Sequence, residues 1–406
     1  MRIAIVSNNF LPYIGGIERQ NQLLSEALVK RGHEVTVLTR RYDPALPKHE
    51  IRNGVRIQRL WPSGGGVLAK WLMNVGVCRC IAWARPAYDV VLVTQWSAHI
   101  LGAALGSVPR QTSLVIKTSQ NDEFSGAISD PSLRRLPFGI RHGIAVGLGS
   151  ARAWALRRVD FVIALSKKLA REAEAFGFQK NSIVLCPQAV DVDRFRPVTE
   201  SEKVRLRASL GIDLHAEVVT YVSRLVQGKG HLTLIDAWVG IARERPQALL
   251  LLVGGGPGVN SPLDAEVSVR KAIEAAGLDG RVRLTGPVKD VERYLQAGDV
   301  FVFPSEAEGF GNTLAEAMAC GMPVICSNIS CGSIDYIVEG VHGYKFAVGN
   351  GRELRVKLSQ LLADVPCQQA MGRAGRVLAA HQLNLECVID ENEKVLMAAA
   401  SKRTVR

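Results

Sequence analysis

Short apolar, β-branched runs alternate with segments of helical periodicity along nearly the whole chain, and this alternation restricts the fold more than any other feature. The run RIAIVSN (2–8) precedes the turn residues NNFLPYIGG, a helical pattern that ends near Gly32, and a second run, EVTVLTR (34–40). Two strands joined by a helix of this length form a βαβ unit and therefore lie parallel in one sheet. The pattern predicts an α/β fold.

The alternation continues twice over, with a polar, charged stretch around 197–213 between the two halves. Asn53-Gly54 between strand-like runs indicates a hairpin. In the first half we expect further strands at 88–95, 113–119 and 159–166, and helices at 67–84, 97–106 and 138–157. In the second half we expect strands at 217–225, 248–256, 282–286, 300–305 and 323–327, and helices at 232–245, 263–276, 290–298, 313–320 and 351–363. Two doubly wound parallel-sheet domains follow, over 1–198 and 199–380, with a helical segment, 381–406, that crosses back to the first.

The net charge of +12 is confined to the first half of the 406-residue chain. Residues 1–198 hold 27 Lys and Arg against 14 Asp and Glu, whereas the remainder holds 23 against 24. The two halves are therefore expected to face different partners. Polar residues and Pro12 come too early for a secretory signal, and no uninterrupted apolar run reaches about 18 residues. Eight cysteines without a C-x-x-C pair are typical of reduced thiols, and we expect a cytoplasmic protein.

Polar and glycine-rich motifs follow several of the predicted strands. Open parallel sheets bind ligands at the carboxyl ends of their strands, where backbone N–H groups and helix N-termini collect. Gly15-Gly16 follows the first strand, and paired glycines let the backbone approach a ligand, although a tight turn explains them equally well. In SRLVQGKGH, Arg224 and Lys229 beside two glycines suit a diphosphate, or form an ordinary solvated loop. GGGPG (254–258) does not complete the dinucleotide fingerprint G-x-G-x-x-G.

The stretch SEAEGFGNTLAE (305–316) places two carboxylates around a glycine-rich turn. The preceding strand delivers Glu308 to the sheet edge, Asn312 or Thr313 can cap the next helix, and Glu316 then falls in its first turn. Carboxylates there can accept hydrogen bonds from sugar hydroxyls. Taken singly, each acid also has an explanation that involves no ligand. Glu316 can complement the helix dipole, and Glu308 can lie in solvent.

Taken together, Arg224 and Lys229, GGGP, the stretch 294–327 and Gly15-Gly16 resemble a retaining GT-B glycosyltransferase of the large Glu-x7-Glu family. The resemblance covers nearly the whole chain and is strongest over 217–345. It implies transfer of a sugar, with retention and without a metal ion or other cofactor, from a UDP- or GDP-linked donor to a glycan or lipid-linked acceptor. The first domain would bind the acceptor and the second the nucleotide sugar, in cell-surface polysaccharide, lipopolysaccharide or glycolipid assembly.

The resemblance also implies residue roles. Arg224 and Lys229 would neutralise the diphosphate and assist departure of the nucleoside diphosphate, while Glu308 would hold the donor sugar's hydroxyls and Glu316 those of the ribose. The implied donor-binding residues are Gly15, Gly16, Gly254, Gly256, Glu308, Gly309, Phe310, Gly311, Asn312, Thr313 and Glu316. Many members carry a histidine where this chain has Thr118, Ser119 and Gln120. Ser119, Asp122 and Glu123 are the acceptor candidates, although loop carboxylates are usually just solvated.

Two segments of the first half combine arginines with aromatic residues and contain no acid. They are 67–86, with Trp71 and Trp83, and 131–158, with Trp154. Such a surface suits the anionic inner face of the cytoplasmic membrane, where a peripheral enzyme would meet a lipid-linked acceptor. Core packing with solvated arginines explains the same residues. Nucleic-acid binding is not expected, because no recognisable module is present.

Three other functions fit parts of the same pattern. A sugar-nucleotide epimerase or a phosphorylase can share the fold; the first would need no acceptor and the second would need phosphate. A non-catalytic protein that binds nucleotide sugars or membranes is a different class. The complete set of Arg224, Lys229, Glu308 and Glu316 favours an enzyme. A dehydrogenase is disfavoured by the incomplete dinucleotide fingerprint.

Overall fold

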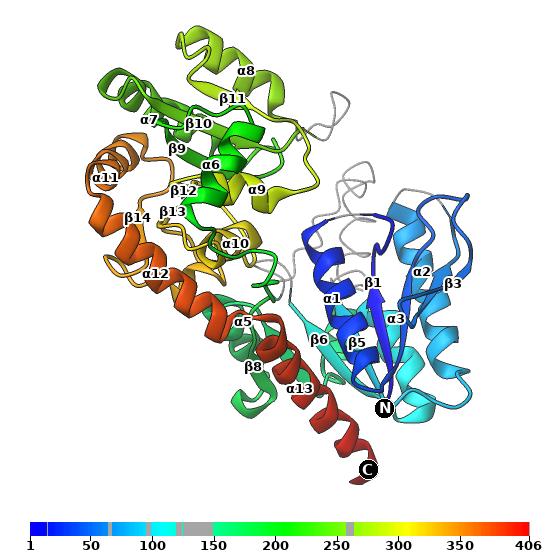
Figure 1. The fold of residues 1–406 in the computed structure, drawn as a ribbon. Helices are drawn as coiled ribbons and strands as arrows, with labels where there is room; N and C mark the ends of the chain where they lie inside the picture. The colour runs from blue at the N-terminus through cyan, green and yellow to red at the C-terminus, as the bar shows by residue number, and fades with distance from the viewer. Residues whose placement is uncertain are drawn as a thin grey trace. The chain divides into compact units, whose positions relative to one another are not determined.

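A computed structural model describes residues 1–13, 15–63, 67–94, 99–118, 124, 149–256 and 264–405 of the chain. Its contacts divide the chain into two compact units. The first comprises Met1–Ala189 and Val388–Arg406, and the second comprises Val190–Cys387. Each unit is built on one predominantly parallel sheet with helices packed against it (Figure 1), as the alternating pattern predicts.

The first unit contains an eight-stranded sheet of order β3-β4-β2-β1-β5-β6-β7-β8. Its strands are β1 Arg2–Ser7, β2 Glu34–Arg40, β3 His49–Arg52, β4 Val55–Leu60, β5 Val90–Thr94, β6 Ser113–Lys117, β7 Phe161–Ala164 and β8 Ile183–Leu185. Only the β3–β4 pair is antiparallel. Asn53 and Gly54 join that pair with φ angles of 49° and 78°, which is the left-handed conformation expected of an Asn-Gly hairpin.

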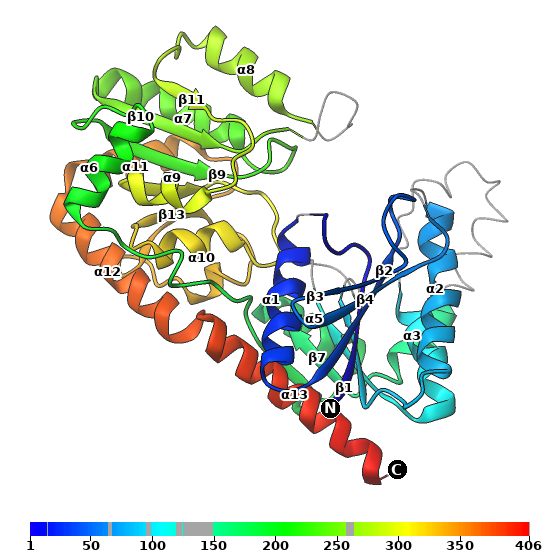
Figure 2. The ribbon, with the colours of Figure 1, turned by 45° about the vertical axis from the view of Figure 1, so that its right-hand side comes forward.

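Helices cover both faces of this sheet, so its central strands are largely apolar. Helix α1 (Gly16–Lys30) packs on β1, β2 and β4, whereas α2 (Val67–Ala82) and α3 (Ile100–Ser107) lie together on the other side (Figure 2). All five residues of β5 are buried. Strands buried on both faces read as continuous hydrophobic runs, which is why these strands could be predicted from the sequence.

The C-terminal helix α13 (Leu385–Val405) belongs to the first unit from Val388 onward. Asn392 of α13 accepts a hydrogen bond from the buried Lys117 Nζ at 3.2 Å, and Ala399 O accepts one from Ser113 Oγ at 2.7 Å. At the end of α1, Arg31 Nη1 and His33 Nε2 each lie 2.6 Å from the carboxylate of Glu393. These polar contacts fix the helix on the sheet.

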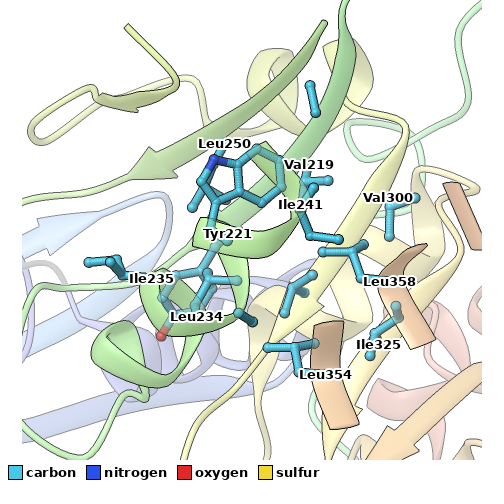
Figure 3. Packing of buried hydrophobic residues seen from close by; sticks show 14 of the residues in the cluster. Val219, Tyr221, Leu234, Ile235, Ile241, Leu250, Val300, Ile325, Leu354 and Leu358 are labelled. Atoms are coloured by element: carbon cyan, nitrogen blue, oxygen red, sulfur yellow. The ribbon is translucent and has the colours of Figure 1, made fainter. Parts of the chain in front are cut away.

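The second unit contains a six-stranded parallel sheet of order β11-β10-β9-β12-β13-β14. Its strands are β9 Glu217–Val222, β10 Ala248–Val253, β11 Val282–Leu284, β12 Val300–Phe303, β13 Val324–Ser327 and β14 Gly343–Phe346. Its helices are α6 Glu200–Ser209, α7 His231–Glu244, α8 Glu266–Ala275, α9 Val291–Ala297, α10 Asn312–Ala319, α11 Gly351–Ala363 and α12 Val365–Gln382. Residues of α7, α8 and α11 pack on β9, β10 and β12 as one apolar cluster, in which Tyr221 lies beside Leu234 (Figure 3).

Several elements were not expected from the sequence, namely α5 (Lys167–Phe176), α6, α12, β8 and β14. Helix α6 occupies part of the charged stretch interpreted above as a connection. Its start is a capping box in which Thr199 Oγ1 accepts from the Glu202 N–H and the Glu202 carboxylate accepts from the Thr199 N–H. This cap stabilises a helix whose apolar face is too weak to be recognised by periodicity.

The observed division between the units falls at Ala189–Val190, before the boundary that we placed at 198. The Val190 N–H donates to Leu383 O at 2.7 Å, and Arg194 pairs with Glu292 at 2.7 Å. Arg376 Nη1 donates to the carbonyls of Val192 and Phe195. These contacts tie the connecting segment to the second unit.

The buried Lys117 is expected to make stability depend on pH. Burial lowers its pKa below the unfolded-chain value of about 10.4. Between the two pKa values the unfolded chain holds the proton and the folded chain does not, so the free energy of unfolding rises with pH in that window. Lys117→Met removes this contribution. The free energy of unfolding, measured with urea between pH 7 and 10, should therefore rise less with pH than in the wild type.

The matched control is Lys394→Met, which removes an exposed lysine of α13 paired with Glu391. Its unfolding should keep the wild-type pH dependence. If the free energy of unfolding depends on pH in the same way in all three proteins, the buried Lys117 side chain does not contribute to that dependence.

Candidate active site

Two loops at the carboxyl ends of neighbouring strands, the one after β9 and the one after β12, approach each other closely. The Glu306 N–H donates to Gly228 O at 2.9 Å. Gly230 has a φ of 70°, and a Cβ atom added there would lie 1.9 Å from Pro304 O. Only glycine permits both the left-handed conformation and this contact. The contact brings the end of SRLVQGKGH against the start of SEAEGFGNT.

Lys229 and Glu308 form an ion pair where these loops meet. The Ser305 hydroxyl also donates to Glu308 Oε1, at 3.2 Å. Both charged side chains are 20% exposed, so the pair is partly shielded and still open to solvent. The Arg224 side chain is exposed, and in the described part of the chain it has no hydrogen-bond or ion-pair partner. The structure therefore brings Lys229 and Glu308 together and leaves Arg224 as an available cation.

Two buried rings, those of Tyr221 and His231, lie next to the loop that carries Lys229. The Tyr221 hydroxyl donates to Lys229 O at 2.6 Å, and its ring centroid lies 5.3 Å from that of His231. Burial raises the pKa of Tyr221, so the phenol stays protonated. Burial, together with the charge of Lys229, lowers the pKa of His231 to about 4. At neutral pH both rings are uncharged, and Lys229 is the local cation.

The first glycines of GGGPG, Gly254 and Gly255, contact the loop that carries Arg224. Gly254 has a φ of 131°, and a Cβ there would lie 2.0 Å from Ser223 O, so the ends of β9 and β10 can approach only because this residue is glycine. Gly255 O accepts from the Leu225 N–H at 3.0 Å, and the Gly256 N–H donates to Glu266 Oε2 at 2.9 Å. In this structure Gly254 and Gly256 make structural contacts, and their contact with a donor stays a prediction.

The loop from Gly309 to Gly311 is braced from behind and leads into α10. Gly309 O accepts from the Gly332 N–H at 3.0 Å, and Phe310 O accepts from the Ser333 N–H at 2.8 Å. Phe310 is buried, whereas Asn312 and Thr313 are half-buried at the start of the helix. The first N–H groups of α10 are therefore presented next to Glu308 by a rigid loop.

Two details of the helix start were predicted wrongly. Neither Asn312 nor Thr313 caps α10, because Gly311, with a φ of 79°, occupies the N-cap and lets the chain enter the helix without a side-chain cap. Asn312 is consequently the first helical residue, and Glu316 lies in the second turn instead of the first. Glu316 is half-buried, and its charge contributes to raising the pKa of Arg194.

The remaining predicted residues belong to the first unit. Gly15 is the N-cap of α1 in an extended conformation, and a Cβ there would lie 2.3 Å from Glu18 Oε2. Gly16 begins the helix. Ser119, Asp122 and Glu123 lie outside the described residues. A role of Gly15, Gly16 or these three residues at a ligand stays a prediction.

Sequence reasoning missed Tyr221, Ser305 and His231, which hold the ion pair and its loop in place. Tyr221 and Ser305 lie at strand ends, where a hydroxyl-bearing residue reads as part of the buried strand. His231 follows the glycine of GKG, and its signal is only its place at a predicted helix start. Their contacts arise between segments far apart in the chain.

Within the described ranges, no three His, Cys, Asp or Glu side chains gather as metal ligands would. Among the described helices, none combines the length and the apolar character needed to cross a bilayer.

Known proteins resemble this chain over both units. A family model for a "glycosyl transferase 4-like domain" matches residues 15–189, and one for "glycosyl transferases group 1" matches residues 202–378. The GDP-mannose-dependent alpha-(1-6)-phosphatidylinositol monomannoside mannosyltransferase of Mycolicibacterium smegmatis is 30% identical over 394 residues, which cover 92% of either chain.

Solved structures show the same fold. Sucrose-phosphate synthase from Thermosynechococcus elongatus has a TM-score of 0.79 at 23% identity, covering 99% of either chain. The Anabaena protein HepE, solved in complex with UDP-glucose, has a TM-score of 0.74 at 21% identity and covers 98% of this chain and 100% of that one. The two-domain GT-B fold is thereby confirmed.

The contact between the two loops can be tested with two glycine variants. Gly230→Ala combines a φ of 70° with the clash against Pro304 O, whereas Gly228→Ala has a φ of 78° and nothing within 4 Å of the added Cβ. A left-handed alanine costs about 1 kcal/mol, and overpacking adds about 1–3 kcal/mol. Urea unfolding should therefore show that Gly230→Ala lowers the free energy of unfolding distinctly more than Gly228→Ala does. If the two variants lower it equally, the loops can separate without cost.

Proposed function

Because this chain belongs to the group 1 glycosyltransferases, we propose that it transfers a sugar from a nucleotide-diphosphate sugar with retention of anomeric configuration. The observation that carries this proposal is the Lys229–Glu308 ion pair at the carboxyl edge of the second unit's sheet, with the exposed Arg224 on the same loop as Lys229. An epimerase or phosphorylase would use the same donor groups. The family match over both units favours the transferase.

The charges suit a donor diphosphate. In the structure Lys229 neutralises Glu308; a bound diphosphate would compete for the ammonium, and Arg224 lies five positions earlier on the same loop. Fixed cations stabilise the negative charge that develops on the departing nucleoside diphosphate, so no metal ion is needed for that step. Glu308, still held by Ser305, would then accept hydrogen bonds from the donor sugar, and Glu316 from the ribose.

A binding screen with nucleotide sugars would identify the donor base and sugar. The mycobacterial relative is named for GDP-mannose, and the HepE structure holds UDP-glucose. We expect one of these nucleotide classes to raise the melting temperature of this protein more than the other. Lack of stabilisation by every UDP- and GDP-sugar would refute the donor proposal, and conversion of the sugar without an acceptor would indicate an epimerase.

The first unit is proposed to bind the acceptor. The mycobacterial relative is named for an acceptor that is a phosphatidylinositol monomannoside, and a structural neighbour, WaaG, is described as involved in lipopolysaccharide biosynthesis. Both names suit assembly of a glycolipid or a cell-surface polysaccharide at the cytoplasmic side of the membrane. The basic excess of the first half agrees with an acceptor or surface that carries negative charge.

Lys229→Ala should lower the transfer rate by at least about 100-fold, because the departing diphosphate loses its positioned cation. Product formation is measured with EDTA present, where the wild type is expected to keep full activity. Lys271→Ala, which removes an exposed lysine of α8, serves as control and should transfer normally. A wild-type transfer rate in Lys229→Ala would contradict the role assigned to Lys229. Loss of wild-type activity in EDTA that magnesium restores would contradict a metal-free reaction.

The described part of the basic, aromatic segments gathers at one edge of the first unit. The C-terminal ends of α2, α3 and a helical stretch ending at 156 all precede parallel strands, so they lie at the amino edge of the sheet. There, Arg79 lies over the Trp83 ring at 5.3 Å and Arg158 over the Trp154 ring at 4.9 Å. Trp83 is 64% exposed and Trp154 38%. We propose that this edge contacts anionic lipid, which leaves the carboxyl edge free for ligands.

Helix α2 divides between the core and the surface. It buries Met73, Val77 and Ile81 in the core and leaves Val75 exposed. Among the described side chains of α2, the three buried ones therefore belong to the core of the unit and not to an exposed surface. Residues 131–148 lie outside the described residues, and their role stays a prediction.

Replacing both Trp83 and Trp154 by alanine should weaken binding to phosphatidylglycerol-containing vesicles by at least about tenfold, because two large interfacial side chains are lost. Co-sedimentation of the wild type should decline with salt, since the arginine contribution is screened. Trp61→Ala, at an equally exposed tryptophan after β4, is the control and should bind like the wild type. Absence of binding to any anionic vesicle would refute the surface.

A further inference from the structure

Arg40, the last residue of β2, is a buried arginine whose charge is not balanced. The residue is 9% exposed. Its Nη2 donates to Asn9 Oδ1 at 3.1 Å, but its Nε is buried and has no acceptor in the described part of the chain. No carboxylate among the described residues pairs with it; the one group that favours its charge is the Tyr13 hydroxyl, and burial lowers its pKa.

Other buried arginines of the same protein show what a structural role requires. Arg59, 4% exposed at the end of β4, also has a buried Nε without an acceptor among the described residues, but it pairs with Glu50 at 2.7 Å and donates to Leu11 O and Pro47 O. Arg207, 6% exposed in the second unit, pairs with Asp299 at 2.7 Å and donates to three carbonyl oxygens. The Arg40 side chain, by contrast, donates to one neutral amide, that of Asn9, and to no carboxylate among the described residues. A buried charge without a counter-charge is costly and is expected to serve a ligand.

The position of Arg40 suits a ligand. It ends a central strand at the carboxyl edge of the first unit's sheet, where open parallel sheets bind their ligands. The loop after β1 packs beside it, since the Arg40 N–H donates to Asn8 O at 3.2 Å. Two further donors belong to that loop. Asn9 Nδ2 has no acceptor among the described residues, and Tyr13 is 43% exposed with its ring against Tyr42.

We infer that Arg40 is the anion-binding residue of the acceptor site, and that the acceptor carries an oxyanion, a phosphate ester or a carboxylate. The planar guanidinium presents parallel N–H donors that match either group, and Asn9 Nδ2 and the Tyr13 hydroxyl add donors to the same anion. The bound anion would supply the missing counter-charge. This inference rests on the proposed function, because it assigns a substrate class to the acceptor half of that site.

The test uses the full chain and two simple anions. Melting temperatures are measured against inorganic phosphate and against acetate, with saturating UDP or GDP so that the diphosphate site of the second unit is occupied. Phosphate or acetate should stabilise the wild type further. The apparent affinity for that anion should fall at least about tenfold in Arg40→Gln and also in Arg40→Lys, which keeps the charge but loses the guanidinium fork.

The matched control is Arg41→Gln, which removes the neighbouring guanidinium, bound to the carbonyls of Leu46 and Pro44 of its own loop. It should keep the wild-type response. A stronger response to phosphate indicates a phosphorylated acceptor, and a stronger response to acetate a carboxylated one. No anion response in the wild type, or an equal response in Arg40→Gln, would overturn the inference.

Failure of the proposed function gives a different result. If neither UDP nor GDP stabilises the wild type, the donor site is wrong, and the anion titration without nucleotide still measures Arg40 by itself. With an active acceptor in hand, Arg40→Gln should raise the acceptor KM and leave the donor KM unchanged. A structural role alone would alter both constants or the melting temperature without ligand.

Discussion

The contact between the Gly230 backbone and Pro304 O is the constraint on which the rest of the candidate site depends. It joins the loops after two neighbouring strands so tightly that no Cβ atom fits between them. With the loops in contact, Lys229 pairs with Glu308, while Tyr221 donates to the carbonyl of Lys229 within its own loop. The paired charges are thus held before any ligand arrives, which lowers the cost of organising them around a diphosphate.

The two sheets present different chemistry at their carboxyl edges. In the second unit, cations stand beside a carboxylate that can accept from sugar hydroxyls. In the first unit, Arg40 is a buried cation without a carboxylate among the described residues. A donor with phosphates and hydroxyls suits the former, and an anion with few hydroxyl contacts suits the latter. The uneven charge of the two halves follows the same division.

Much of the architecture could be predicted because buried parallel strands are continuous apolar runs. β1, β2, β5, β9, β10 and β12 lie where the sequence placed them. β8 and β14 are short edge strands of three and four residues, and they carry too few apolar positions to be distinguished from loop. Helix α6 was missed because its apolar face is weak, and because the contacts of its Arg207 with Asp299 and backbone carbonyls exist only in the folded unit.

The fold class, the family and the residue types of the candidate donor site could be inferred from the sequence, because these depend on periodicity and on motifs within one loop. Which of these residues meet depends on how the chain packs. Glu308 lies 79 positions from Lys229, and Asn9 lies 31 from Arg40. Packing also places Gly311, not a capping side chain, at the N-cap of α10, and among the described residues it gives Arg40 no carboxylate partner like that of Arg59. Burial and pairing are properties of packed neighbours, and no single stretch of sequence contains them.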